Sequence, residues 1–183
     1  MKDLSLHILD IFQNSIRAGA TVVTLRVTFS RSINKVEFEV VDNGCGMGEE
    51  MILAVSDPFY TSRTMRKVGL GIPLLLQNAL QCGGNVEIQS QIGVGTSLKA
   101  WFEFDHWDRP PLGDMGELVS LLISGNPSVK LFFEAKSDEG EYTIDSSMIE
   151  EALDGLEVGL PQVVIFIKEM IQENFEAIGI ENK

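Results

Sequence analysis

The sequence predicts an α+β fold in which helices cover one face of a mostly antiparallel sheet, a two-layer α/β sandwich. Two kinds of segment indicate it. In some, apolar residues recur at helical spacing, and in others apolar and polar residues alternate as in half-buried strands. Because the connections between consecutive strands are short, we expect those strands to run antiparallel. Helices and strands of this kind pack as two layers around one core.

The charge of the chain is unevenly distributed. Its 183 residues carry a formal net charge of −13. Residues 1–106 hold 9 basic and 11 acidic side chains, whereas residues 107–183 hold 5 and 16. Nucleic-acid binding requires a basic stripe, so we predict no nucleic-acid partner. The near-neutral first part can host an anion, and the acidic second part suits a basic partner.

We predict a cytoplasmic protein without a membrane segment. No stretch approaches the ~18 uninterrupted apolar residues that a membrane span needs. The first residues lack a basic start followed by a small-residue cleavage site, so no secretory leader is expected. Cys45 and Cys82 form no CxxC pair and have no histidine at ligand spacing, which argues against a disulfide scaffold or a zinc site.

Periodicity predicts the elements of the first part of the chain. We expect helices over residues 3–18, 49–55 and 70–82, and strands over 21–29, 35–41, 86–90 and 97–104. Gly19 and Gly83 follow two of these helices as stop signals. Residues 57–68 are polar and basic without a clear period, and we predict a loop there.

A boundary is expected near residues 108–111, which divides the chain into domains of residues 1–106 and 107–183. The second is predicted to be a small α+β domain of no recognised fold. We expect its helices over residues 115–123, 147–153 and 161–178, and a hairpin over 130–144. Ser146 or Ser147 should cap the middle helix with Glu150, and Trp107 should seal the second domain onto the first.

Three polar residues share one face of the first predicted helix. Asp10, Asn14 and Arg17 are spaced four and three residues apart. A carboxylate, a carboxamide and a guanidinium together suit a nucleotide, because they can orient a hydroxyl, ligate Mg²⁺ and pair with phosphate. An ordinary solvated helix face has the same pattern.

A second motif follows a predicted buried strand. Asp42 is followed by Gly44, Gly46 and Met47. Glycines let the backbone approach a flat ligand closely, and a carboxylate can accept a hydrogen bond from an exocyclic amine. The alternative is a hairpin turn, since Asn-Gly is a strong turn signal. Cys45, between the glycines, is interpreted as a small residue that fits rather than a reactive thiol.

Two further glycine pairs are weaker signals. Gly69 and Gly71 flank Leu70 at the start of an apolar helix, where free amides attract phosphate. Simple helix-start glycines would look the same, but basic residues directly before them favour an anion site: Arg63, Arg66 and Lys67. The other pair, which precedes Thr96 between two strands, is by itself only a turn.

In this order the motifs resemble the GHKL ATPase superfamily, which contains gyrase, the heat-shock chaperone ATPase, histidine kinases and the MutL mismatch-repair ATPases. The matching segments are DIFQNSIRA (10–18), VDNGCGM (41–47), DPFYTS (57–62), VGLGI (68–72) and GVGTSL (93–98). The resemblance spans about residues 3–104. It implies a Bergerat-type ATP-binding fold, with ATP and Mg²⁺ as cofactors.

The resemblance also implies a role for each matched residue. Asn14 would ligate Mg²⁺, Asp42 would bond the adenine amine, and Gly46 would pass beneath the base. Thr96 would reach the adenine region, and Arg17 would meet the phosphates. The remaining implied ATP contacts are Gly44, Met47, Arg63, Lys67, Gly69, Leu70 and Gly71, the last five within or directly after a mobile lid over about residues 57–68.

Departures from the family pattern shape the expected activity. Arg17 stands where MutL has an acid, and the short lid resembles that of histidine kinases. Histidine kinases carry an upstream domain with a phospho-accepting histidine, which we do not expect here; His7 and His106 are interpreted as structural or surface residues. Asp10 replaces the usual catalytic Glu and is one methylene shorter, which leaves hydrolysis open.

Three functions follow, in order of preference. The first is a stand-alone, Mg²⁺-ATP-dependent kinase that transfers the γ-phosphate to a partner protein in trans, with Asp10 as its catalytic residue. The second is an ATP-controlled binding module with little catalysis. The third, weaker alternative is a MutL-like ATPase that dimerises on ATP. The partner is a protein substrate or signalling protein that the sequence does not identify.

Overall fold

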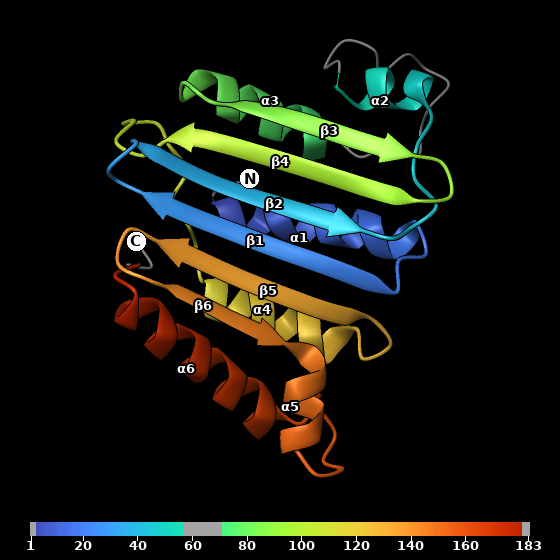
Figure 1. Cartoon of the computed structure of the whole chain (residues 1–183), viewed down its shortest axis with the longest axis vertical. Helices are drawn as coiled ribbons and strands as arrows, with labels where there is room; N and C mark the ends of the chain where they lie inside the picture. The colour runs from blue at the N-terminus through green and yellow to red at the C-terminus, as the bar shows by residue number, and fades with distance from the viewer. Residues whose placement is uncertain (1–2, 57–70, 181–183) are drawn as a thin grey trace.

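The computed structural model describes residues 3–56 and 71–180 (Figure 1). The elements follow in this order: α1 (Leu4–Arg17), β1 (Val22–Ser30), β2 (Lys35–Asp42), α2 (Glu49–Ser56), α3 (Gly71–Gln81), β3 (Asn85–Gln91), β4 (Gly95–Glu103), α4 (Met115–Gly125), β5 (Lys130–Ser137), β6 (Glu141–Asp145), α5 (Ser146–Ala152) and α6 (Pro161–Ala177). Each agrees with its predicted position to within two residues. The predicted loop over 57–68 lies outside the described residues.

One six-stranded sheet runs through the molecule in the order β3-β4-β2-β1-β5-β6. Its pairs are antiparallel except β1 with β5. Helices α1, α3 and α4 lie behind it in Figure 1, and α6 packs on α4. The predicted two-layer α+β sandwich with a mostly antiparallel sheet is therefore confirmed.

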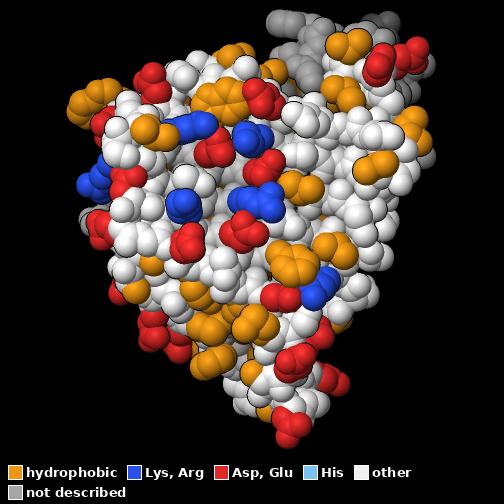
Figure 2. Space-filling view, in the orientation of Figure 1, with side chains coloured by type: hydrophobic (Ala, Val, Ile, Leu, Met, Phe, Trp, Pro, Cys, Tyr) orange, Lys and Arg blue, Asp and Glu red, His pale blue; other side chains and the backbone are white. Residues whose placement is uncertain are grey.

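The strands bury one face and leave the other in solvent. In the β1–β2 hairpin, Leu25 lies opposite Val40 and Val27 opposite Phe38, and all four side chains are buried. Alternate residues form the open face, where Arg26 bonds both Glu39 and Glu134. Lys and Arg side chains alternate with Asp and Glu across this face (Figure 2). The period-two pattern of the sequence thus sets which face meets the helices.

Helix α1 is fixed at both ends. The Asp3 carboxylate caps it by accepting a hydrogen bond of 2.9 Å from the amide of Leu6. At the other end Gly19 adopts a φ of +77°, which turns the chain into β1. Since Ile8 and Phe12 are buried against the sheet, the opposite face of the helix end is available for polar groups.

The second part of the chain was predicted as a separate small domain, but its strands β5 and β6 join the sheet of the first part. Strand β5 runs parallel to β1, with Leu25 opposite Phe133, and both side chains join the common core. Phe175 of α6 stacks on Phe133 with ring centroids 5.9 Å apart. A four-strand sheet ending at β1 would expose an unpaired edge, and β5 covers it.

Two local expectations in this second part were also wrong. The cap of α5 is Asp145, whose carboxylate accepts from the amide and the hydroxyl of Ser147 at 2.9 Å. Ser146 is buried instead, and its hydroxyl accepts from the amide of Leu131. Trp107 seals nothing in the described structure, because its side chain is 99% exposed. No helix among the described residues is both long and apolar enough to cross a membrane.

Candidate functional site

A cavity of about 290 Å³ lies where α1, the end of β2 and the start of β4 meet α2 and α3. It is mainly apolar with a few convergent polar groups, the usual make-up of a small-molecule site. Its walls are formed by Ile11, Asn14, Ser15, Arg17, Ala18, Val40, Asp42, Cys45, Gly46, Met47, Met51, Val55, Ile72, Thr96 and Leu98. Six of the predicted site residues are among them.

Asp42 is the most firmly positioned polar group of the cavity. Its Oδ2 accepts a hydrogen bond of 2.6 Å from the Ser15 hydroxyl, and its Oδ1 accepts one of 2.8 Å from the Gly44 amide. Gly44 is buried, and a Cβ there would lie 2.8 Å from that of Ala18. The two donors hold the carboxylate in one orientation at the cavity wall. Ser15 was not among the predicted site residues, although it adjoins Asn14.

The chain after β2 is a loop that leads to α2 and lines the cavity, rather than the hairpin turn considered as the alternative. The Cys45 amide donates to the carbonyl of Ala18 at 2.8 Å, and the Cys45 carbonyl accepts from Gly93. Gly46 has a φ of +66°, and a Cβ on it would lie 2.0 Å from the carbonyl oxygen of Gln91. Only glycine fits there, which explains the close approach of this loop to the β3–β4 turn.

Ser90 joins the two sides of the loop. Its hydroxyl accepts from the Met47 amide at 2.7 Å and is hydrogen-bonded to the Thr96 hydroxyl at 2.8 Å. This connection places Met47 and Thr96 on neighbouring parts of the wall. Gly95 also needs to be glycine, because a Cβ there would lie 1.9 Å from the Asp42 carbonyl oxygen. The Gly-Thr motif therefore holds the end of β2 as well as making a turn.

Asn14 and Arg17 face the cavity, so the polar face of α1 is not simply solvated. The Arg17 guanidinium donates to Asn14 Oδ1 at 3.0 Å. Asp10 lies one turn earlier and is not part of the lining. Its Oδ2 is buried without a hydrogen-bond partner among the described residues, and a Cβ on Gly71 would lie 1.8 Å from it. Asp10 is thus directed at the first residue of α3.

The basic residues and the first glycine of the motif before α3 lie outside the described residues, as does Leu70: Arg63, Arg66, Lys67, Gly69 and Leu70. Gly71, the last residue of this predicted group, is described and lies at the N-terminus of α3. Across residues 3–56 and 71–180, no three His, Cys, Asp or Glu side chains come together as a metal site would require. Any Mg²⁺ at the cavity would depend on Asn14 and on ligand oxygens.

The histidines are placed as structural residues. His7 is fully buried, and its Nε2 lies 3.0 Å from the Asn78 amide nitrogen on α3. Burial lowers the pKa of His7 to about 4, so the ring is neutral at ordinary pH. His106 accepts from the amide of Asp108 at 3.1 Å. His7 is therefore inaccessible to a phosphate donor, and its role is to bridge α1 and α3.

The sandwich fold thus holds an apolar cavity with a fixed carboxylate at its wall, which is suited to a flat ligand that carries a hydrogen-bond donor. Comparison with known families gives the class. The model of the histidine kinase-, DNA gyrase B- and HSP90-like ATPases matches residues 2–106. The chain belongs to this ATPase family, whose members bind ATP.

Histidine kinases are among its relatives in sequence. The chain is 27% identical over 110 residues to the sensor histidine kinase ZraS of Escherichia coli K12, covering 60% of this chain and 23% of that protein. It is 30% identical over 91 residues to sporulation kinase D of Bacillus subtilis, covering 50% and 18%. The chain thus spans less than a quarter of either relative.

Solved structures show the same fold. The ATPase domain of Aquifex aeolicus MutL complexed with ADP aligns with a TM-score of 0.51 at 18% identity, covering 86% of this chain and 69% of that one. The N-terminal domain of a DNA repair protein aligns with a TM-score of 0.52 at 15% identity, covering 79% and 52%. Each alignment covers more residues than the first 106, so both extend into the second part of the chain.

Proposed function

We propose that the cavity binds Mg²⁺-ATP and that the protein transfers the γ-phosphate to a partner protein in trans. The observation that carries the ATP site is the Asp42 carboxylate, held by Ser15 and Gly44 at the wall of an apolar cavity. A carboxylate fixed in this way can accept a hydrogen bond from the exocyclic amine of adenine. Val40 and Leu98 supply apolar surface for the base.

The phosphates would extend from the base toward α1 and α3. Arg17 offers a guanidinium for phosphate oxygens, and the start of α3 at Gly71 offers free backbone amides. Gly69 and Leu70, with Arg63 and Lys67, would complete this part of the site, as their motif implies. Residues of these types would supply positive charge and amide donors to the triphosphate.

The residues present fit Mg²⁺. Asn14 lines the cavity, with its amide oxygen bonded by Arg17, and Asp10 one turn away has a buried carboxylate oxygen without a partner among the described residues. Such an oxygen is costly to bury unless something satisfies it. Asn14 would ligate the ion. The ion would neutralise phosphate charge that develops during transfer.

Asp10 is the residue proposed to act on the proton of the reaction. The attacking hydroxyl or imidazole of the partner must lose a proton as the γ-phosphate is transferred, and a carboxylate within hydrogen-bond reach can accept it. Asp10 stands on the same face of α1 as Asn14, which places base and metal ligand side by side. Since transfer in trans needs an acceptor on another protein, the cavity mouth is where that protein would dock.

A second candidate is an ATP-controlled binding module. Its supporting observation is the position of Asp10, which is directed at Gly71 and does not line the cavity. If Asp10 stays there when ATP is bound, the nucleotide is held without being consumed. The acidic second part of the chain then offers a surface for a basic partner.

The deciding experiment follows the γ-phosphate. The protein is incubated with Mg²⁺, γ-labelled ATP and a soluble extract of the source cells, beside Asn14→Ala and Asp10→Asn. A discrete labelled protein that is absent with both variants supports the kinase. ATP bound by the parent and by Asp10→Asn, without label transfer or phosphate release, supports the binding module instead.

A further inference from the structure

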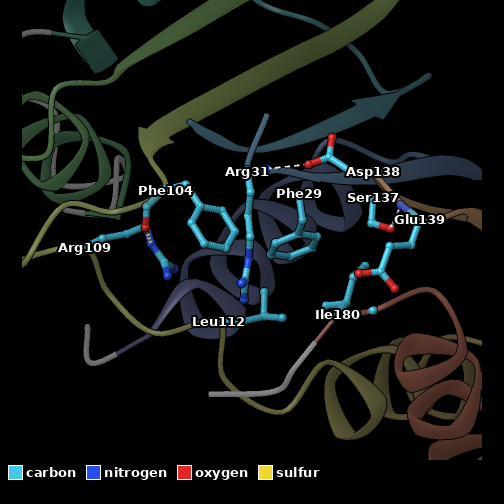
Figure 3. Close-up of a pocket in the computed structure, with 10 residues that line it drawn as sticks. Phe29, Arg31, Phe104, Arg109, Leu112, Ser137, Asp138, Glu139 and Ile180 are labelled. Atoms are coloured by element: carbon cyan, nitrogen blue, oxygen red, sulfur yellow. Dashed lines mark hydrogen bonds between the residues drawn. The ribbon is translucent and has the colours of Figure 1, made fainter. Parts of the chain in front are cut away.

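A second cavity, of about 160 Å³, lies at the other end of the sheet (Figure 3). Its wall combines residues of both parts of the chain: Phe29, Arg31, Phe104, Arg109, Leu112, Ser137, Asp138, Glu139, Gly179 and Ile180. Thr96, near the start of β4, and Phe104, directly after its end, are eight residues apart, so the cavities are separated by about 26 Å of strand. None of the ten lining residues belongs to the nucleotide motifs.

Two arginines flank one aromatic ring in this cavity. The Arg31 guanidinium carbon lies 5.2 Å from the centroid of Phe104, and that of Arg109 lies 5.4 Å from it. In Figure 3 the Arg31 side chain runs between the rings of Phe104 and Phe29 toward Leu112. Arg109 comes from the other side of Phe104. The phenyl ring therefore holds both guanidiniums in fixed positions.

No carboxylate of the described residues lies within 4 Å of either guanidinium. Arg109 Nε donates to the Phe104 carbonyl at 2.9 Å and its Nη1 to that of Pro110, which leaves Nη2 without a partner among those residues. Burial lowers the pKa of Arg109, which Asp105 partly opposes. In a chain of net charge −13, two neighbouring arginines that form no ion pair with a described residue are unusual, although Asp138 and Glu139 line the same cavity.

Most other polar groups of the wall are already in use. Asp138 accepts from the hydroxyls of Ser30 and Ser32 and from the amides of Arg31 and Ser32. The Ser137 hydroxyl donates to the Ile178 carbonyl and accepts from two amides. The guanidiniums and the exposed Glu139 carboxylate remain, with Phe29, Leu112 and Ile180 as apolar surface between them.

We propose that this cavity is a binding site for a small organic oxyanion, a carboxylate or phosphate attached to a short apolar group. A guanidinium can donate through two parallel N–H groups to the two oxygens of such an anion, and the apolar wall takes its carbon part. The volume of about 160 Å³ exceeds several times the roughly 30 Å³ that one water takes in the liquid, so a ligand of this class fits. Because both parts of the chain line the cavity, the ligand would hold them together.

The test is an NMR titration of the full chain, labelled with ¹⁵N, at constant ionic strength. Inorganic phosphate, acetate and isobutyrate are added in separate arms while the Nε–Hε signals of Arg31 and Arg109 are followed. We expect saturable shifts in at least one arm, with a dissociation constant on the order of millimolar. The arm that saturates identifies phosphate or carboxylate, and isobutyrate binding more tightly than acetate would show that the apolar wall contributes.

Two variants should change binding in opposite directions, and a third should leave it unchanged. Arg31→Gln should weaken binding about 5- to 10-fold, because a charged donor is lost. Glu139→Gln should strengthen it about 2- to 5-fold, because a like charge is removed from the wall. Lys99→Gln removes one positive charge from the open face of the sheet, where Lys99 lies 3.8 Å from Glu37, and should leave binding unchanged.

The proposal is overturned if no arm saturates below about 50 mM, well above the millimolar range expected of a weak site. It is also overturned if Arg31→Gln binds like the parent, or if Lys99→Gln weakens binding as much as Arg31→Gln does. Arg31 is exposed and Glu139 is exposed, so neither variant should prevent folding. The result is independent of whether the first cavity binds ATP.

Discussion

The two ends of the sheet differ in how they are assembled. At one end the nucleotide cavity takes its polar groups from α1 and from the two strand ends at Asp42 and Thr96, each within a recognisable motif. At the other end the arginine cavity is made from residues of four separate segments, 29–31, 104–112, 137–139 and 179–180, with no motif among them. A site that depends on backbone shape can therefore be recognised from its sequence motifs. A site built from scattered side chains becomes visible only in the tertiary structure.

The two ends also differ in charge. A carboxylate faces the nucleotide cavity as the group proposed to select the ligand, and Arg17 is the single basic residue on its described lining. In the other cavity two guanidiniums face the space. The amine of adenine donates hydrogen bonds, whereas a small oxyanion only accepts them. The carboxylate of the first cavity therefore suits adenine, and the guanidiniums of the second suit an oxyanion.

The largest expected effect is on the nucleotide end. Asn14→Ala should abolish Mg²⁺-ATP binding, since it removes the proposed metal ligand, and Asp42→Asn should weaken ATP about 10- to 100-fold because a charged hydrogen-bond acceptor is lost. Calorimetric titration with ATP and with GTP measures both. In Asp42→Asn the ratio of the affinity for ATP to the affinity for GTP should be smaller than in the parent. Parent-like ATP binding by both variants would show that the residues are wrongly assigned.

Backbone shape at the nucleotide end gives the next effect. Gly46→Ala places a Cβ 2.0 Å from a carbonyl oxygen at a φ of +66°, so the loop must move. We expect it to destabilise the protein by roughly 2–4 kcal/mol and to impair ATP binding. Gly93→Ala is the matched control: its φ is +77° with no atom within 4 Å, so only backbone strain of about 1 kcal/mol applies. Urea denaturation measures the free energy of unfolding of both variants. Equal losses of stability would contradict the close approach of Gly46 to the Gln91 carbonyl oxygen.

A third effect concerns the helices between the two ends. His7 has a folded pKa of about 4 against 6.5 ordinarily, so below pH 6.5 the unfolded chain binds a proton that the native chain does not. Stability should therefore fall as pH decreases from 6.5 to 4, by up to about 3 kcal/mol. His7→Gln, which can keep the bond to Asn78, should lose that part of the pH dependence. Urea unfolding of parent and variant at several pH values measures it, and parallel profiles would contradict the prediction.

The smallest effect is expected where the arginine end joins the two parts. Hydrogen bonds, first from the Ser30 hydroxyl and then from Ser32 and Arg31, lower the pKa of Asp138 to about 2. Its stabilising contribution is complete above pH 3.8 and is lost as pH falls through 2. Asp138→Asn should lower the Tm at pH 7, with the difference from the parent shrinking toward pH 2. A Tm difference that is independent of pH would mean that the carboxylate charge plays no part.

Most of the fold follows from local patterns in the sequence. Periodicity located α1, the β1–β2 hairpin and α3, because each depends on neighbours within a few residues. The parallel pairing of β5 with β1 was not predictable in this way, since the two strands are about a hundred residues apart and both have the same alternating pattern. The cap of α5 was misassigned for a related reason: Asp145 ends a strand and begins a helix, and both roles are compatible with the local sequence.

The site shows the same division. The motifs located Asp42, Gly46 and Thr96 because glycines at fixed spacing betray a close backbone approach. Ser15 and Ser90 were missed, since a single serine carries no pattern and only the folded chain brings each to its partner. Trp107 was overvalued because an aromatic residue at a boundary usually packs, and here it is exposed.

The most direct test of the account is an NMR titration of the ¹⁵N-labelled chain with Mg²⁺ and a non-hydrolysable ATP analogue. Binding at the nucleotide end predicts saturable shifts of the amides of Ser15, Gly44 and Thr96, which surround the Asp42 carboxylate. The amide signals of Arg31 and Phe104, at the other end of the sheet, should not shift. Shifts confined to the arginine end, or no saturable shift around Asp42, would contradict the account.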